Sequence, residues 1–135
     1  VDLLSGDIPG ELRAEYRDRF PVCELSKMLR KARLILTDDD SAELHHIMST
    51  GRRVDVLSNL ITVSRTAHRW CHTHPIDGRL ICLNLKRSKQ ELDLDEFRRC
   101  SGRNLTGWLD TLTPIHTLAA TAKQELVAWC EQGSE

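Results

Sequence analysis

Apolar side chains in the first quarter of the chain recur every three or four residues, with charged side chains between them. This spacing lines up one apolar stripe along a helix. It predicts a helix over residues 11–20, which ends at Pro21, and a second helix over residues 22–36. The apolar run at residues 34–36 is also compatible with a short strand at the end of that segment.

After residue 40 the pattern changes to shorter segments. Runs of β-branched and apolar residues predict three strands, over residues 42–48, 59–63 and 79–85. Helical spacing predicts three short helices, over residues 65–72, 93–100 and 105–112. Thr113 and Pro114 suit the N-cap and first turn of a last helix, which we expect to continue to about Glu131. Short strands mixed with short helices predict an α+β fold.

The size and composition of the chain limit the class of protein. A length of 135 residues suits a single domain over residues 1–135, and 40% apolar with 29% charged residues is an ordinary globular balance. No apolar run approaches the roughly 18 residues of a membrane span, so no membrane partner is expected. The net charge of −1 neither favours nor excludes a nucleic-acid partner, because the distribution of charge decides that question.

The five cysteines are odd in number and irregularly spaced, and no Cys-x-x-Cys pair is among them. A disulfide framework is therefore not expected, and reduced thiols in a cytoplasmic protein fit the pattern better. The absence of a visible signal peptide agrees with a cytoplasmic location. Cys71, Cys82 and Cys130 are expected to be small core residues.

Four of the six histidines fall within 28 residues, as the neighbours His45 and His46 and as His68 and His72. Neighbouring side chains on a strand point to opposite faces, whereas side chains four residues apart on a helix share one face. One of the two strand histidines can therefore join the helical pair as three convergent nitrogen ligands. Three protein ligands with one open position are typical of a catalytic metal site. The other strand histidine is then free to act as a base.

The order and spacing of these residues resemble a known family. The chain is similar to the HNH endonucleases, the ββα-metal or His-Me finger nucleases, in three segments: Leu44-His45-His46-Ile47, Leu57-Ser58-Asn59-Leu60-Ile61 and Ala67-His68-Arg69-Trp70-Cys71-His72. The steps of nine residues from Asn59 to His68 and four from His68 to His72 are similar to those of the colicin-type branch. The resemblance implies a ββα-metal finger over residues 42–74, with helical extensions over 11–33 and 93–131.

The resemblance also implies a role for each motif residue. His45, His68 and His72 match the metal ligands, and His46 matches the general base that takes a proton from the attacking water. Asn59 matches the residue that holds the loop and orients the base. The implied cofactor is one divalent metal ion, Zn²⁺, Mg²⁺, Mn²⁺ or Ni²⁺, which stabilises charge on the phosphate and the leaving oxygen. The implied activity is hydrolysis of DNA phosphodiester bonds, by an enzyme of a kind often encoded by phages and mobile elements.

The sequence departs from many members of this family, which carry two Cys-x-x-Cys knuckles around the motif. The second pair would fall at Ser64 and Ala67, so a structural zinc is not expected and the surrounding helices must supply the stability. The alternative function is a DNA-binding module that uses the same finger without cleavage. A zinc-stabilised protein-interaction domain is disfavoured, because three histidines leave the site open. A homodimer is compatible with double-strand cleavage, which often calls for two active sites.

Basic side chains flank the motif on both sides. They are Arg52, Arg53, Arg65, Arg69, Arg79, Lys86 and Arg87, followed by Lys89. As a group they predict contacts with the phosphates of a nucleic-acid backbone, which are independent of base sequence and sensitive to salt. For any one of them, ordinary solvated surface explains the charge equally well. His74 is expected in an exposed turn, and His116 is expected to be structural or solvated.

Overall fold

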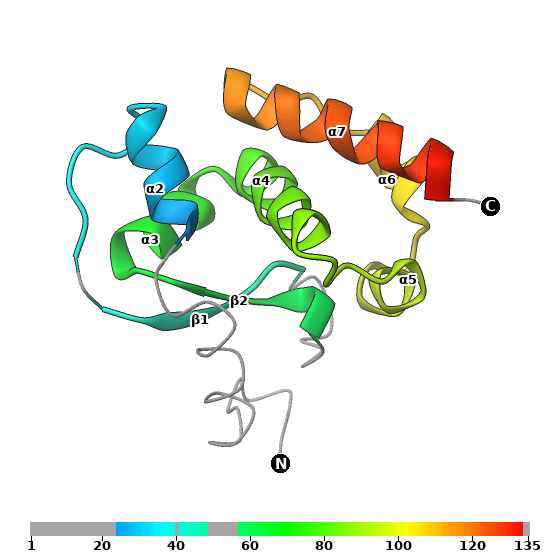
Figure 1. Cartoon of the computed structure of the whole chain (residues 1–135), viewed down its shortest axis with the longest axis horizontal. Coiled ribbons are helices and arrows are strands. Elements are labelled where there is room, and N and C mark those ends of the chain that lie inside the picture. The colour runs from blue at the N-terminus through cyan, green and yellow to red at the C-terminus, as the bar shows by residue number, and fades with distance from the viewer. Residues whose placement is uncertain (1–23, 40, 49–56, 134–135) are drawn as a thin grey trace, which may run out of the picture.

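A two-stranded antiparallel sheet packs against helices, and the chain passes directly from the second strand into a helix (Figure 1). The structure, a computed structural model, describes residues 24–39, 41–48 and 57–133. In chain order, its elements are α2 (Glu24–Lys31), β1 (Glu43–His46), the 3-10 helix η2 (Leu57–Asn59), β2 (Leu60–Val63), α3 (Arg65–Thr73), α4 (Pro75–Ser88), α5 (Leu94–Ser101), α6 (Leu105–Asp110) and α7 (Thr117–Gly133). This mixture of helices and sheet agrees with the predicted α+β class.

The helix predicted over residues 22–36 is confirmed in part. α2 ends at Lys31, because Arg33 adopts a left-handed φ of 60° and the backbone N–H of Leu34 donates to the carbonyl of Leu29. Residues 34–36 form no strand. The helix predicted over residues 11–20 lies outside the described residues.

The two strands set the direction of the histidines. β1 pairs with β2 in the register Glu43 to Val63 and His45 to Ile61. Because paired residues of an antiparallel sheet share a face, these four side chains lie on the same side of the sheet. Ile61 and Val63 belong to the main hydrophobic core. The face of the sheet that carries His45 is therefore the one that packs against the helices.

The helix predicted over residues 65–72 is confirmed as α3, and two polar residues hold its first turn. Ser64 is the N-cap, and its hydroxyl accepts a hydrogen bond from the N–H of Ala67 at 3.1 Å. The carboxylate of Asp39, from the segment before β1, accepts from the N–H groups of Arg65 at 3.3 Å and Thr66 at 3.1 Å. The start of α3 is thus tied to the chain that leads into the first strand.

The strand predicted over residues 79–85 is wrong, because these residues lie inside α4. Every residue over 80–86 is buried, so this helix shows no contrast between an apolar and a polar face. Pro75 occupies its first turn, where a missing N–H is tolerated. Gly78 allows α4 to approach α3 closely, since a Cβ at this position would lie 3.0 Å from the Cα of Cys71.

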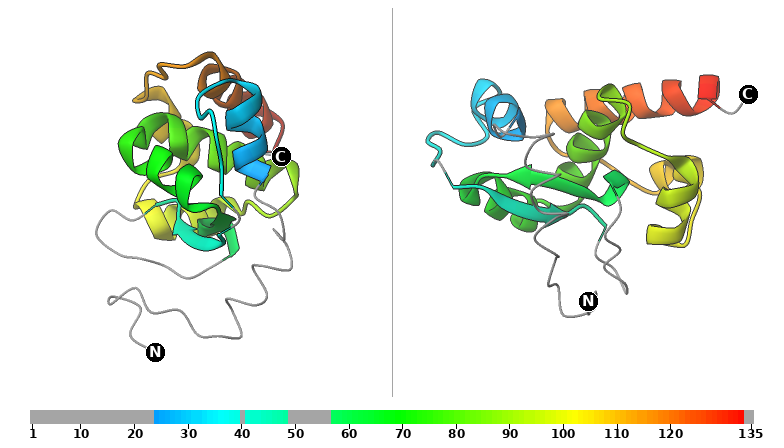
Figure 2. Two further views of the ribbon diagram at one scale, coloured as in Figure 1. Left: turned by 90° about the vertical axis from the view of Figure 1, so that its left-hand side faces the viewer. Right: turned by 60° about the horizontal axis from the view of Figure 1, so that its bottom comes forward.

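α7 covers the side of α4 that is farthest from the strands (Figures 1 and 2), whereas α5 lies beside η2, which leads into β2. The helices predicted over residues 93–100 and 105–112 are confirmed as α5 and α6. Their N-caps are Asp93 and Asn104, whose side chains accept backbone N–H groups of the first turn. α7 packs along α4 and contributes Leu126 and Cys130 to the core.

The last helix begins later than the Thr113–Pro114 pair predicts, at Thr117. The reason is a tertiary contact from the first turn of α4. The buried carboxylate of Asp77 accepts hydrogen bonds from the N–H groups of Ile115 at 3.0 Å and His116 at 2.9 Å, and pairs with Nδ1 of His116 at 2.6 Å. These bonds hold the chain in a non-helical conformation up to the start of α7.

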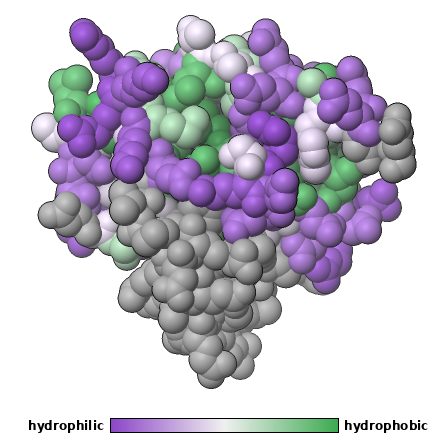
Figure 3. All heavy atoms as spheres, viewed as in Figure 1, coloured by the Kyte–Doolittle hydropathy of each residue, from purple (hydrophilic) through white to green (hydrophobic). Residues whose placement is uncertain are grey.

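Polar and charged side chains dominate the described surface on the face shown in Figure 3, with smaller apolar areas between them. Leu36 and Ile115 are large apolar side chains that remain exposed, at 84% and 80%. Within the described ranges, no helix is both long and apolar enough to cross a membrane.

The Asp77 contact predicts a pH-dependent contribution to stability. Burial raises the pKa of this carboxyl, but the hydrogen bonds from Ile115 and His116 outweigh burial and hold the pKa below its ordinary value of 3.8. The carboxylate therefore stabilises the fold above about pH 3.8, and this contribution is lost as the pH falls through the lower pKa of the folded protein. We expect Asp77→Asn to lower the free energy of unfolding at pH 7 by roughly 2 kcal/mol, as measured by urea denaturation.

The matched control is Asp110→Asn, at an exposed position on α6, which should leave the free energy of unfolding unchanged. When both measurements are repeated near pH 3, the difference in free energy of unfolding between wild type and Asp77→Asn should be smaller than at pH 7. An equal difference at the two pH values would show that the charge of Asp77 does not hold the start of α7.

Candidate metal centre

Three histidines from two elements converge on the helical side of the sheet. His45 comes from β1, and His68 and His72 come from successive turns of α3. Each offers one ring nitrogen, and these three atoms all lie within 4.8 Å of one another. The ring centroids are 4.9 Å apart for His45 and His68, 5.5 Å for His45 and His72, and 4.7 Å for His68 and His72. This group can hold one metal ion.

The three imidazoles differ in their access to solvent. His45 is 6% exposed, the side chain of His68 is 24% exposed, and His72 is exposed. The group is therefore closed on the side of His45 and reached by solvent on the side of His72. A divalent ion held by three nitrogens keeps at least one coordination position for water or substrate, which is the arrangement of catalytic sites.

The environment of His45 suits a metal ligand. Its Nδ1 is buried and has no hydrogen-bond partner among the described residues. Burial is the main cause that lowers the pKa of His45 to about 3, and the nearby charges of His68, His72, His46 and Arg79 lower it further. The imidazole is therefore neutral near pH 7, and the neutral form is the one that binds metal ions. The residues present thus fit a divalent cation.

Glu43 orients one of the three ligands, and the sequence motif did not identify it. Its Oε1 lies 2.9 Å from Nδ1 of His68, and its Oε2 lies 3.4 Å from Nε of Arg65. The bond with His68 is the largest cause of a lowered pKa of the Glu43 carboxyl. If Nδ1 of His68 donates to this carboxylate, Nε2 keeps its lone pair for a metal. The spacing between Glu43 and His45 could have identified Glu43 from the sequence, because residues two apart on a strand share a face.

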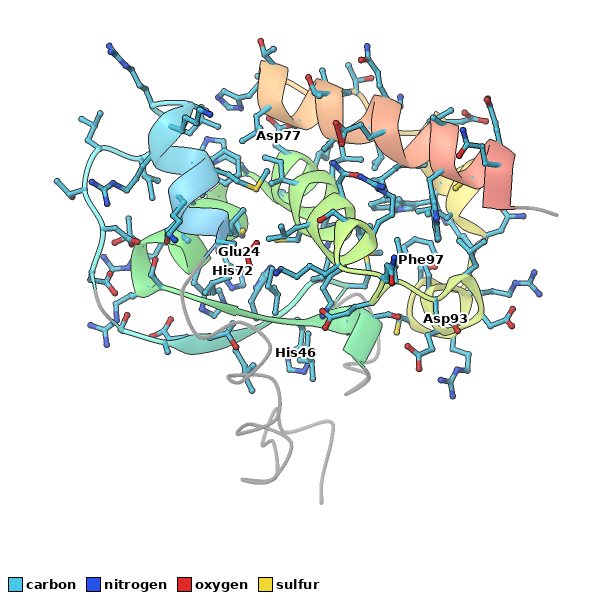
Figure 4. The ribbon with its side chains drawn as sticks, viewed as in Figure 1. Glu24, His46, His72, Asp77, Asp93 and Phe97 are labelled. Carbon is cyan, nitrogen blue, oxygen red and sulfur yellow. The ribbon has the colours of Figure 1, made fainter. Side chains whose placement is uncertain are left out.

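His46 is the last residue of β1, and Asn59 is the last residue of η2, directly before β2. His46 is half-buried, and its side chain projects from β1 on the opposite side from His72 (Figure 4), as the alternation of a strand predicts. Asn59 is buried and bridges the backbone of Met48: its Nδ2 donates to the Met48 carbonyl at 3.0 Å, and its Oδ1 accepts from the Met48 N–H at 2.7 Å. These two bonds hold the chain where it leaves the strand that carries both histidines.

The basic residues predicted to contact phosphates are not equally placed. Arg65 and Arg69 are exposed on α3 beside the histidines, and Arg79 lies close enough to His45 to influence its pKa. Arg87 bonds Asn84 at 2.7 Å and pairs with Glu125 of α7 at 3.4 Å. Arg52 and Arg53 lie outside the described residues.

The prediction that Lys86 contacts a nucleic-acid phosphate is wrong. Its side chain is 0% exposed, and Nζ lies 3.1 Å from Oε1 of Glu91, whose side chain is 8% exposed. A side chain enclosed in this way is not placed to meet a phosphate. A buried ammonium needs a close carboxylate, so the pair belongs to the core. Lys89, the next cation along the chain, pairs with Glu24 at 2.5 Å.

The two remaining histidines form a separate group. His74 is the C-cap of α3, in the bend before α4, so the predicted turn is confirmed. It stacks on Trp70 with 4.4 Å between the ring centroids and is half-buried, so the predicted exposure is wrong. His116 lies 5.4 Å from His74 and pairs with Asp77. His116 is therefore structural, as expected.

Comparison with known proteins adds no relative to this description. No protein-family model, no curated protein and no solved structure matches the chain. The function therefore has to be argued from the geometry and chemistry of the three-histidine group.

The contact between Glu43 and His68 predicts an effect on metal affinity. We expect Glu43→Ala to weaken the binding of Zn²⁺ or Ni²⁺ by roughly 10- to 100-fold, because His68 loses the group that fixes its ring and tautomer. Isothermal titration calorimetry measures this change. Glu43→Gln, which keeps an acceptor oxygen, should lose less metal affinity than Glu43→Ala. Glu125→Ala, at an exposed position on α7, is the control, and equal losses in both alanine variants would contradict the assigned role of Glu43.

Proposed function

We propose that this protein is a metal-dependent DNA endonuclease of the HNH type, in which β1, β2 and α3 form the ββα-metal finger. The observation that carries the proposal is the convergence of His45, His68 and His72 within 4.8 Å, closed on one side and open to solvent on the other. The chain also presents these residues in the order strand, strand, helix, with Asn59 directly before β2. Both features agree with the motif that the sequence resembles.

The three ligands would hold one divalent cation through neutral ring nitrogens. When bound, the cation supplies electrostatic stabilisation of the phosphate and of the leaving oxygen. His45 contributes the closed side of the group, and Glu43 fixes the ring of His68. Borderline metals such as Zn²⁺ and Ni²⁺ bind imidazole more strongly than Mg²⁺ does, so they are the first ions to test for binding.

His46 is the proposed general base. It would accept a proton from the attacking water on a ring nitrogen, because imidazole is the side chain best suited to transfer protons near neutral pH. It adjoins His45 and projects to the other side of β1, so one short strand carries both a ligand and the base. Asn59 would act as a positioning residue, because its bonds to Met48 hold the chain just after His46.

Arg65 and Arg69 are the basic residues best placed to bind the DNA backbone. Both are exposed and lie on α3, the helix that carries His68 and His72. Contacts to phosphate would position a duplex near the metal without reading its sequence. Arg79 is half-buried and near His45, so it would act closer to the scissile phosphate.

Cleavage of supercoiled plasmid tests the activity directly. We expect nicking or linearisation with Mg²⁺, Mn²⁺, Ni²⁺ or Zn²⁺ that stops when EDTA is added. His46→Ala should lower the cleavage rate by about 10²- to 10⁴-fold, the usual contribution of a general base. His74→Gln, outside the three-histidine group, should cut at the wild-type rate. Gel electrophoresis of the plasmid forms over time gives the rates.

The same assay separates the alternatives. If the His46→Ala variant cleaves plasmid at the wild-type rate, His46 is not the base. Binding in a gel shift without cleavage by any of the four metals favours the non-catalytic DNA-binding module. Absence of both binding and cleavage refutes the proposed function.

The phosphate contacts predict a change in salt dependence. We expect Arg69→Ala to bind duplex DNA more weakly and to reduce the slope of log affinity against log salt by about one, because one counterion-releasing contact is lost. Fluorescence anisotropy in the His46→Ala background measures binding without cleavage. Arg98→Ala is the control, since Arg98 is exposed on α5, at the far end of the molecule from α3 in Figure 1. Equal effects of the two substitutions would argue against a DNA surface on α3.

A further inference from the structure

A second group of ligand atoms shares His45 but not the other two histidines. Its further members are Cys71 of α3 and Cys82 of α4, and their sulfur atoms lie 4.0 Å apart. One ligand atom from each of the three residues lies within 4.8 Å of the other two. All three residues are buried: His45 is 6% exposed, Cys71 is 4% exposed and Cys82 is 0% exposed. We call this the inner group.

The packing of α3 on α4 brings the two thiols together. A Cβ at Gly78 would lie 3.0 Å from the Cα of Cys71, so the two helices approach closely there. Cys82 follows Gly78 by four residues, which is one helical turn on the same face of α4. The approach of the two backbones at Gly78 therefore places the next turn of α4, with its thiol, beside Cys71. Nothing in the spacing of the cysteines along the sequence indicates this pair.

The environment of His45 indicates that a partner belongs beside its ring. Its Nδ1 is enclosed by protein and has no hydrogen-bond partner among the described residues. A buried nitrogen without a partner destabilises a fold by about 1–3 kcal/mol, so such atoms in native proteins usually have a role. A metal ion is one partner that an imidazole nitrogen beside two thiols can accept.

We propose that His45, Cys71 and Cys82 form a second metal site, which binds a soft divalent cation such as Zn²⁺ or Cd²⁺. Two sulfur ligands and one imidazole favour such ions over Mg²⁺, Ca²⁺ or Mn²⁺. On binding, each thiol transfers its proton to solvent and a sulfur–metal bond forms, with no change of oxidation state. Two thiolates neutralise the two charges of the cation, which makes its burial tolerable.

This site does not depend on the proposed endonuclease function, because it requires only His45, Cys71 and Cys82. It does affect the group of His45, His68 and His72, which we call the outer group, since His45 belongs to both. A neutral imidazole has one nitrogen with a free lone pair, so a cation in the inner group and a cation in the three-histidine group would compete for His45. The two groups also differ in the hardness of their ligands and in access to solvent, so they should select different ions.

Cadmium is the probe for this site, because thiolates bound to Cd²⁺ give an ultraviolet charge-transfer absorption that imidazoles do not give. All proteins carry Cys23→Ser, so that this thiol outside the described residues does not contribute. We expect one Cd²⁺ per chain with thiolate absorption in the parent protein. Cys71→Ala and Cys82→Ala should each weaken cadmium binding by more than about tenfold and lower the absorption. Cys100→Ala, a buried cysteine on α5, is the matched control and should bind as the parent does.

His68→Ala separates the two groups, because it removes a ligand of the outer group only. The absorption should persist in this variant, and its loss there would show that cadmium binding to the thiolates requires His68, which would overturn the proposal. Cadmium bound to the parent protein without thiolate absorption would place the ion on the three histidines and would also overturn it. Persistence of the absorption in both Cys71→Ala and Cys82→Ala would also overturn it, as would an equal loss in Cys100→Ala.

A measurement on the parent protein keeps the test valid if a cysteine variant does not fold. The cadmium-113 resonance moves downfield with each sulfur ligand, so it reports the number of thiolates without any substitution in the inner group. A position typical of two sulfurs and at least one nitrogen supports the proposal. A position typical of nitrogen and oxygen ligands alone refutes it.

Discussion

The antiparallel register of β1 and β2 is the constraint on which the site depends. Side chains alternate between the faces of a strand, so a slip of one residue would turn His45 outward and His46 toward the helices. The pairing of His45 with Ile61 prevents this, because Ile61 must remain in the core. Burial of one apolar residue on β2 thus decides which of two neighbouring histidines meets the pair on α3.

The position of α3 relative to these strands is held by polar contacts at its first turn. Asp39 accepts hydrogen bonds from the N–H groups of Arg65 and Thr66, and Ser64 bonds Ser26 of α2 at 2.8 Å. The family that the sequence resembles often has a cysteine of a zinc knuckle at the position of Ser64. In this protein Ser64 caps α3 and bonds α2, so hydrogen bonds connect the two helices at this position.

The same imidazole lies at the centre of two possible metal chemistries. Toward solvent, His45 meets two histidines in a group that leaves room for water and substrate. In the interior, it meets two cysteines in a group without exposed members. Ligand hardness and burial favour a borderline ion exchanging with solvent in the first case and a soft ion held in the interior in the second. The low pKa of His45 follows mainly from its burial, which keeps the ring neutral and able to bind a metal.

The sequence by itself determined the local elements around the histidines, because these depend on short-range signals. Strand residues near His45 and Asn59, and the helical pattern over residues 65–72, were sufficient to predict β1, β2 and α3. The tertiary structure alone decided what depends on distant contacts. Residues 79–85 form a helix because α4 is enclosed by its neighbours, and α7 starts late because Asp77 holds the chain before it. The bond from Glu43 to His68 and the contact of Cys71 with Cys82 each join different segments, so no local pattern indicates them. Lys86 is enclosed because α4 is packed between its neighbours.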